Sequence, residues 1–109
     1  DMFLFDPKRV NVLGEYGGIG LPVENHLWWN KRNWGYVQFK NSDEVTAEYV
    51  KYANILKDYV KRGFSAAVYT QTTDVEGEVN GLMTYDRKVI KIDEAAVKKA
   101  NQSVINELK

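Results

Sequence analysis

A long amphipathic helix between two β-prone segments sets most of what this chain can fold into. Residues 43–62 repeat apolar side chains at spacings of three and four, which is the pattern of a helix with one buried face. Ser42 is the expected N-cap and Gly63 the C-terminal stop. The apolar face consists of Val45, Tyr49, Tyr52, Ala53, Leu56 and Val60. This helix therefore needs a sheet or a second helix to lie against.

Short β-prone runs lie on both sides of this helix. The first strand is expected at about residues 10–15 and the second at 64–70. A strand, a long helix and a strand in this order are typical of a right-handed parallel crossover. A last helix is expected over residues 94–108, after Asp93 as its N-cap, with an apolar stripe of Val97, Ala100, Val104 and Leu108. The sequence thus predicts an α/β protein with two β/α units.

Alternation along a strand predicts which side chains face the helices. Glu15 is expected on the face opposite Val12, so that Val12 points toward the helices. In the second strand, Tyr69 is expected on the face opposite Ala66 and Val68.

Two long segments remain outside these elements, the loops at residues 16–42 and 71–87. Ordered loops of this length are uncommon in compact domains, and they are usually functional. The second loop has the composition of a short hairpin around Gly77 or around Asn80-Gly81. Its alternating acidic residues do not fit an EF-hand, because a loop counted from Asp74 would need glycine where Val79 stands.

Composition excludes several classes of protein. The chain has 109 residues, of which 44% are hydrophobic, so it has room for one domain at most. Fifteen Lys and Arg balance fifteen Asp and Glu, and no partner that is a nucleic acid or a membrane is expected. There is no cysteine, which excludes disulfides and thiolate metal sites. No apolar run approaches the ~20 residues of a membrane helix.

Glu15 is the first candidate for chemistry. It stands where the first β-prone run ends and a glycine-rich turn with Gly17 and Gly18 begins. A charge at the end of a buried strand costs free energy unless it is paired or used. In barrels of parallel strands, catalytic side chains are mounted at the carboxyl ends of the strands.

Two runs of sequence carry a resemblance to a known family. The runs Val12-Leu13-Gly14-Glu15-Tyr16-Gly17-Gly18 and 69–87, which reads YTQTTDVEGEVNGLMTYDR, resemble the carboxyl-terminal part of glycoside hydrolase family 2. The similarity covers essentially the whole chain. It implies that the two β/α units correspond to the last quarter of a (β/α)8 TIM barrel, with its seventh and eighth strands.

The resemblance implies a retaining β-glycosidase that hydrolyses O-glycosidic bonds, with Glu15 as the nucleophile. The family's acid/base glutamate belongs to an Asn-Glu motif at the end of the fourth strand, and Asn106-Glu107 lies instead in the expected terminal helix. The isolated chain is therefore expected to be inactive and to need the rest of the parent enzyme. No cofactor or metal is expected. The resemblance implies a periplasmic or secreted location.

The candidate contacts to a carbohydrate substrate are Tyr16, His26, Trp28 and Tyr69. Tyr69 stands where many members of the family have tryptophan. Tyr16 is a hydrogen-bond partner of Glu15 or a structural tyrosine, and His26 either meets a sugar hydroxyl or bonds the loop. Residues Trp28, Trp29 and Trp34 form a stacking platform or pack the loop down.

Two further expectations follow from the pattern of elements. The competing function is a non-catalytic carbohydrate-binding or protein-interaction module that uses the Trp-rich loop. Two parallel strands leave open edges, so the isolated chain is expected to form a homo-oligomer or a domain-swapped assembly.

Overall fold

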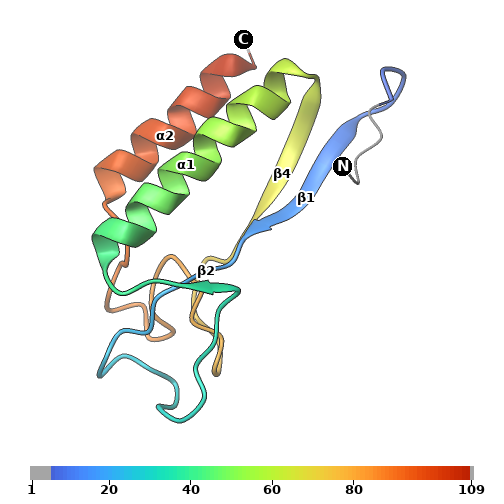
Figure 1. Ribbon diagram of the computed structural model, residues 1–109. Coiled ribbons are helices and arrows are strands. Elements are labelled where there is room, and N and C mark those ends of the chain that lie inside the picture. Colours follow the sequence, from blue (N-terminus) through green and yellow to red (C-terminus); the bar gives the residue numbers. More distant parts are fainter. Residues whose placement is uncertain (1–5, 109) are drawn as a thin grey trace.

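The computed structural model describes residues 6–108 and shows a small α/β protein with two helices and parallel strands (Figure 1). The elements in chain order are β1 (Asn11–Gly17), β2 (Ile19–Gly20), β3 (Val37–Gln38), α1 (Ser42–Lys61), β4 (Phe64–Thr70) and α2 (Glu94–Glu107). The two helices begin and end within one residue of the bounds expected from the sequence. β4 has the expected bounds, and β1 extends two residues further than expected.

The cap of α1 differs from the expectation by one residue. Asn41, not Ser42, is the N-cap, and its side chain accepts a hydrogen bond from the Glu44 backbone N–H at 2.9 Å. The Ser42 hydroxyl instead donates to the Lys91 carbonyl at 2.5 Å. The start of α1 is therefore tied to the segment that leads into α2.

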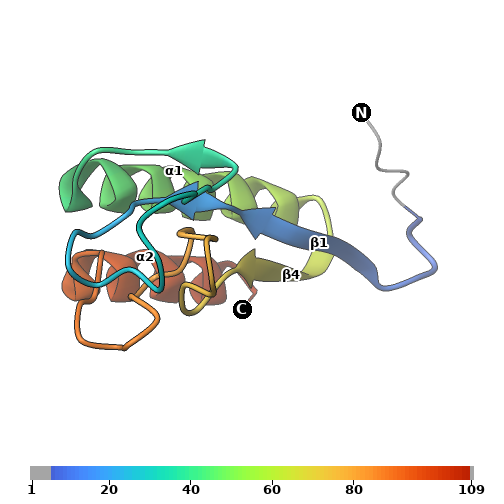
Figure 2. The ribbon, with the colours of Figure 1, turned by 90° about the horizontal axis from the view of Figure 1, so that it is seen from below.

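β1 and β4 pair in parallel, and α1 makes the connection between them. Both helices lie on the same side of this pair, and they run alongside each other (Figures 1 and 2). The short β2–β3 pair lies within the expected loop 16–42 and is also parallel. The other face of the β1–β4 pair has no helix over it in the described part of the chain.

A bulge in β1 changes the faces expected from alternation. Val12 pairs with Ala66 and Glu15 with Val68, so three steps along β1 match two along β4. The extra residue is accommodated at Gly14, whose φ of +83° favours glycine. Val12 consequently shares the open face with Glu15, and the expectation that it faces the helices is wrong.

The expected orientation of β4 is also reversed. Val68 is 54% exposed on the open face, whereas the Tyr69 ring lies 4.9 Å from the ring of Tyr49 in α1. Its cross-strand partner Tyr16 also faces the helices, with its ring 5.3 Å from that of Tyr69 and 6.3 Å from that of Tyr52. The Tyr16, Tyr69 and Tyr49 rings therefore pack together on the helix side of the β1–β4 pair.

The main hydrophobic core lies near the carboxyl ends of β1 and β4, where the loops meet the helices. Its buried members come from β2 and the residue after it, from the first half of α1 and from the first turn of α2. They are Ile19, Leu21, Val45, Tyr49 and Val97. The loops therefore supply part of the core rather than lying over it.

The second loop is organised by a buried ion pair. Lys91 Nζ lies 2.6 Å from Asp74 Oδ1 and donates to the Val79 carbonyl at 2.9 Å. Asp74 Oδ1 also accepts from the Gly81 backbone N–H at 2.9 Å. A tight turn at residues 75–78 places the expected hairpin at Gly77, because Val75 and Glu78 exchange backbone hydrogen bonds.

Candidate active site

Glu15 lies in an open hollow at the carboxyl ends of the two parallel strands. The hollow has a volume of about 230 Å³ and is lined by Glu15, Tyr16, Gly17, Gly18, Tyr36 and Thr70. Glu15 is exposed, and its carboxylate forms no ion pair with any side chain in residues 6–108. The carboxylate is therefore accessible to a ligand that enters the hollow.

Tyr36, the residue just before β3, lines the same hollow. The sequence did not identify it as a candidate site residue. A Cβ atom at Gly18 would lie 2.5 Å from Tyr36 Cδ2, and Gly18 has a φ of +68°. Glycine at this position therefore lets the Tyr36 ring lie against the turn that follows Glu15. The adjacent glycines were the available signal, because they often mark a place where another group approaches the backbone closely.

Glu15 supplies the only carboxylate among the described residues that line this hollow. A retaining glycosidase needs two carboxyl groups about 5 to 5.5 Å apart. The hollow can therefore provide a nucleophile but not both catalytic groups.

Tyr16 and Tyr69 belong mainly to the helix side of the sheet. Burial, together with the nearby Tyr49, raises the pKa of Tyr16 to about 12. Burial also raises the pKa of Tyr69, with smaller contributions from Tyr49 and Tyr16. The Tyr69 hydroxyl is buried and has no hydrogen-bond partner within the described chain, and Tyr69 does not line the Glu15 hollow.

His26 bonds a neighbouring loop, which is one of the two alternatives from the sequence. Its Nδ1 lies 2.9 Å from Asp86 Oδ2. Asp86 Oδ1 accepts from the Thr84 hydroxyl at 2.6 Å and from the Lys88 backbone N–H at 3.0 Å. These bonds, first that from Thr84 and then that from His26, hold the pKa of Asp86 well below its usual range.

Trp28 lies in a different hollow from Glu15. Its ring is 5.7 Å from the ring of Tyr85, and its side chain remains half-exposed. The hollow beside it has a volume of about 450 Å³ and also contacts Trp29. The structure thus brings Glu15 together with Tyr16, and it places His26, Trp28 and Tyr69 outside the Glu15 hollow.

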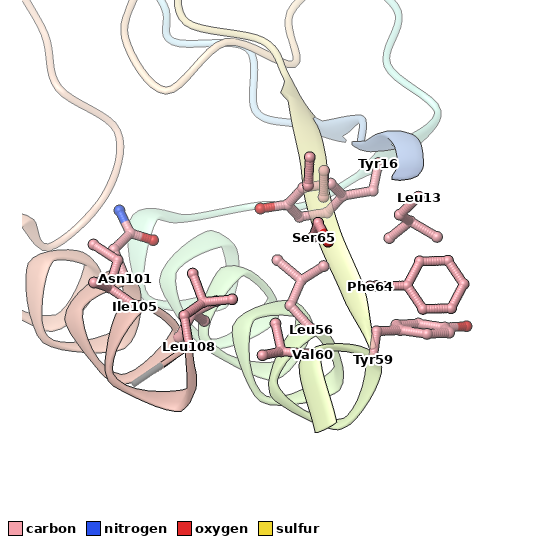
Figure 3. Close-up of a pocket in the computed structure, with 13 residues that line it drawn as sticks. Leu13, Tyr16, Leu56, Tyr59, Val60, Phe64, Ser65, Asn101, Ile105 and Leu108 are labelled. Atoms are coloured by element: carbon pink, nitrogen blue, oxygen red, sulfur yellow. The ribbon is translucent and has the colours of Figure 1, made fainter. Parts of the chain in front are cut away.

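A separate apolar pocket of about 380 Å³ lies between β4 and the two helices (Figure 3). Leu56 and Val60 reach it from α1, Ile105 comes from the last turn of α2, and Leu108 is the residue that caps this helix. No carboxylate or imidazole lines it. Its lining is mostly apolar, with the hydroxyls of Tyr16, Tyr59 and Ser65 and the Asn101 amide as its polar groups.

Within residues 6–108, no group of three or more His, Cys, Asp or Glu side chains is arranged to hold a metal ion. No helix in that range is long and apolar enough to cross a membrane. No protein-family model matches the sequence, and no curated protein matches it either.

Proposed function

We propose that this chain is the carboxyl-terminal part of the catalytic barrel of a retaining β-glycosidase that resembles glycoside hydrolase family 2. Its two β/α units are the last quarter of the (β/α)8 barrel, and Glu15 is the nucleophile. The observation that carries the proposal is an exposed, unpaired carboxylate in a hollow at the carboxyl ends of two parallel strands. Barrel enzymes mount their catalytic side chains at this end.

The arrangement of the two layers supports the same proposal. In a (β/α)8 barrel, helices cover the outer face of the strands and the inner face is enclosed by the other strands. Here α1 and α2 cover one face, and the open face carries Glu15 with the half-exposed Val12 and Val68. The remaining strands of the parent enzyme would enclose that face.

The chemistry divides between this chain and the rest of the parent enzyme. A Glu15 carboxylate oxygen attacks the anomeric carbon while the bond to the leaving oxygen breaks, and a second glutamate from the parent protonates that oxygen. That glutamate then removes a proton from water, the water oxygen attacks the anomeric carbon, and Glu15 is released. The 109-residue chain alone is expected to have no hydrolase activity, since it supplies one of the two carboxylates.

The test uses the parent enzyme. Glu15→Gln should lower kcat on an aryl β-glycoside by about 10⁴-fold or more, with an unchanged thermal unfolding midpoint. Glu94→Gln is the matched control, because Glu94 is exposed in the first turn of α2 and does not line the Glu15 hollow. A 2-deoxy-2-fluoro glycoside should label the peptide that contains Glu15, as seen by mass spectrometry. Near-normal activity of Glu15→Gln would remove Glu15 from the nucleophile role.

A further inference from the structure

Four large aromatic side chains remain exposed on the segment between β2 and β3. Tyr36, Trp34, Trp29 and Trp28 have relative exposures between 46% and 72%. We call these four residues the aromatic path. Exposing this much aromatic surface forgoes the stabilisation that burial would give, and such surfaces commonly mark binding sites.

The aromatic path begins at the Glu15 hollow and continues away from it. Tyr36 lines the hollow that contains Glu15, and its ring makes an edge contact with that of Trp34 at 5.6 Å. Trp34 and Trp29 line a second hollow of about 280 Å³. Trp29 and Trp28 line the third hollow, of about 450 Å³. Consecutive hollows are thus linked by aromatic side chains.

The backbone beneath the aromatic path is held in place by the second loop. The Trp34 backbone N–H donates to the Gly77 carbonyl, and the Trp34 carbonyl accepts from the Val79 N–H, both at 2.7 Å. Trp29 Nε1 donates to the Arg32 carbonyl at 3.4 Å. The rings are therefore presented by a supported backbone, which lowers the conformational cost of binding.

The polar groups between the rings indicate the class of ligand. The second hollow is lined by Arg32, Glu76 and Glu78, and the third by Glu24, Asn25 and Asn30. Charges of both signs, amides and flat apolar rings suit a neutral ligand with hydroxyls at its edges and apolar C–H faces. The formal net charge of the chain is zero, which does not favour a polyanion such as nucleic acid.

We propose that the aromatic path binds a neutral β-linked oligosaccharide or polysaccharide that extends from the Glu15 hollow over successive rings. This inference rests on the proposed function, because that function makes the Glu15 end the position of the bond that is cleaved. It assigns a substrate class to the site: a glycan chain several sugars long, rather than a simple glycoside held at Glu15 alone.

Tryptophan fluorescence tests this directly, because all three tryptophans of the chain belong to the aromatic path. The 109-residue chain is titrated with β-1,4-linked gluco-, manno-, xylo- and galacto-oligosaccharides of one to about five units. In at least one series the affinity should rise with each added sugar. Trp34→Ala should weaken binding of the longest member about three- to tenfold, while Trp34→Tyr should keep most of it.

Ile105→Ala is the control, because Ile105 is an exposed apolar residue on α2 outside the aromatic path. Far-UV circular dichroism confirms that each variant keeps its helices. The absence of length-dependent binding in every series would overturn the proposal, and this is the result expected if the rings dock a protein instead. Equal weakening by Trp34→Ala and Ile105→Ala would overturn it too.

The two proposals fail in distinguishable ways. If the chain binds oligosaccharides with length-dependent affinity but Glu15→Gln leaves the parent enzyme active, only the role of Glu15 as nucleophile is refuted. Hydrolysis that depends on Glu15, with no length-dependent binding, would refute only the aromatic path.

Discussion

Replacing Lys91 by methionine should strongly destabilise the protein, although Lys91 lies outside the helices and strands. The Lys91 side chain is fully buried and Asp74 nearly so, with 0% and 3% of their side-chain surfaces exposed. Burial raises the pKa of Asp74 and lowers the pKa of Lys91, despite the attraction between the two groups. Each charge is therefore costly to bury without its partner.

The expected loss follows from what Lys91→Met leaves behind. Asp74 would keep only the Gly81 N–H on Oδ1, and Asp74 Oδ2 already has no partner among the described residues. Removing one member of a buried ion pair costs about 3–5 kcal/mol. A chain of 109 residues is stable by about 5–15 kcal/mol in total. Lys91→Met should therefore remove a large share of the free energy of unfolding.

The assay is urea unfolding followed by far-UV circular dichroism, with the slope m compared between variants. The double variant Asp74→Asn with Lys91→Met removes both charges and keeps an acceptor for the Gly81 N–H. It should recover most of the loss and lie within about 2 kcal/mol of the unmodified chain. The reasoning is refuted if Lys91→Met costs less than about 1 kcal/mol, or if the double variant is no more stable than the single one.

Two further expectations concern pH and assembly. The folded state holds the Tyr16 proton up to a pKa of about 12, above the ordinary value of about 10, so this contribution is present below about pH 10 and is lost as the pH rises through 12. Tyr16 is only partly buried, so the loss should be about 1 kcal/mol after screening. Tyr16→Phe should abolish this contribution in urea titrations at alkaline pH. The isolated chain should be a homo-oligomer, because β1 and β4 each have an edge without a partner in the described residues. Sedimentation equilibrium at micromolar concentration showing a monodisperse monomer would contradict this.

Local signals in the sequence were sufficient for the helices and for β4. The apolar period of α1 and the Asp93 cap of α2 depend on residues a few positions apart, so they are readable without knowledge of the tertiary structure. The position of Glu15 near the carboxyl end of β1 was predictable for the same reason, although the strand continues to Gly17. Its neighbours in the hollow were not, because Tyr36 and Thr70 come from distant parts of the chain.

The facing of the strands could not be read from alternation. The rule assumes that each residue of β1 advances one position along its partner, and the bulge at Gly14 breaks that assumption. A glycine in a strand is a known sign of a bulge. Gly14 therefore signalled an irregularity, but it did not show which side chains would change face. The Tyr16, Tyr69 and Tyr49 cluster then decides which face meets the helices.

The buried lysine had no local signature at all, and its position gives it a role beyond stability. Lys91 Nζ donates to the Val79 carbonyl, and the Val79 N–H donates to the Trp34 carbonyl. Leu21, in the core next to β2, also donates to the Val79 carbonyl. One residue of the second loop thus connects the ion pair, the core and the aromatic path. Lys91 therefore helps to position Trp34 from a distance. Its hydrogen bond holds Val79, and Val79 in turn holds the Trp34 backbone.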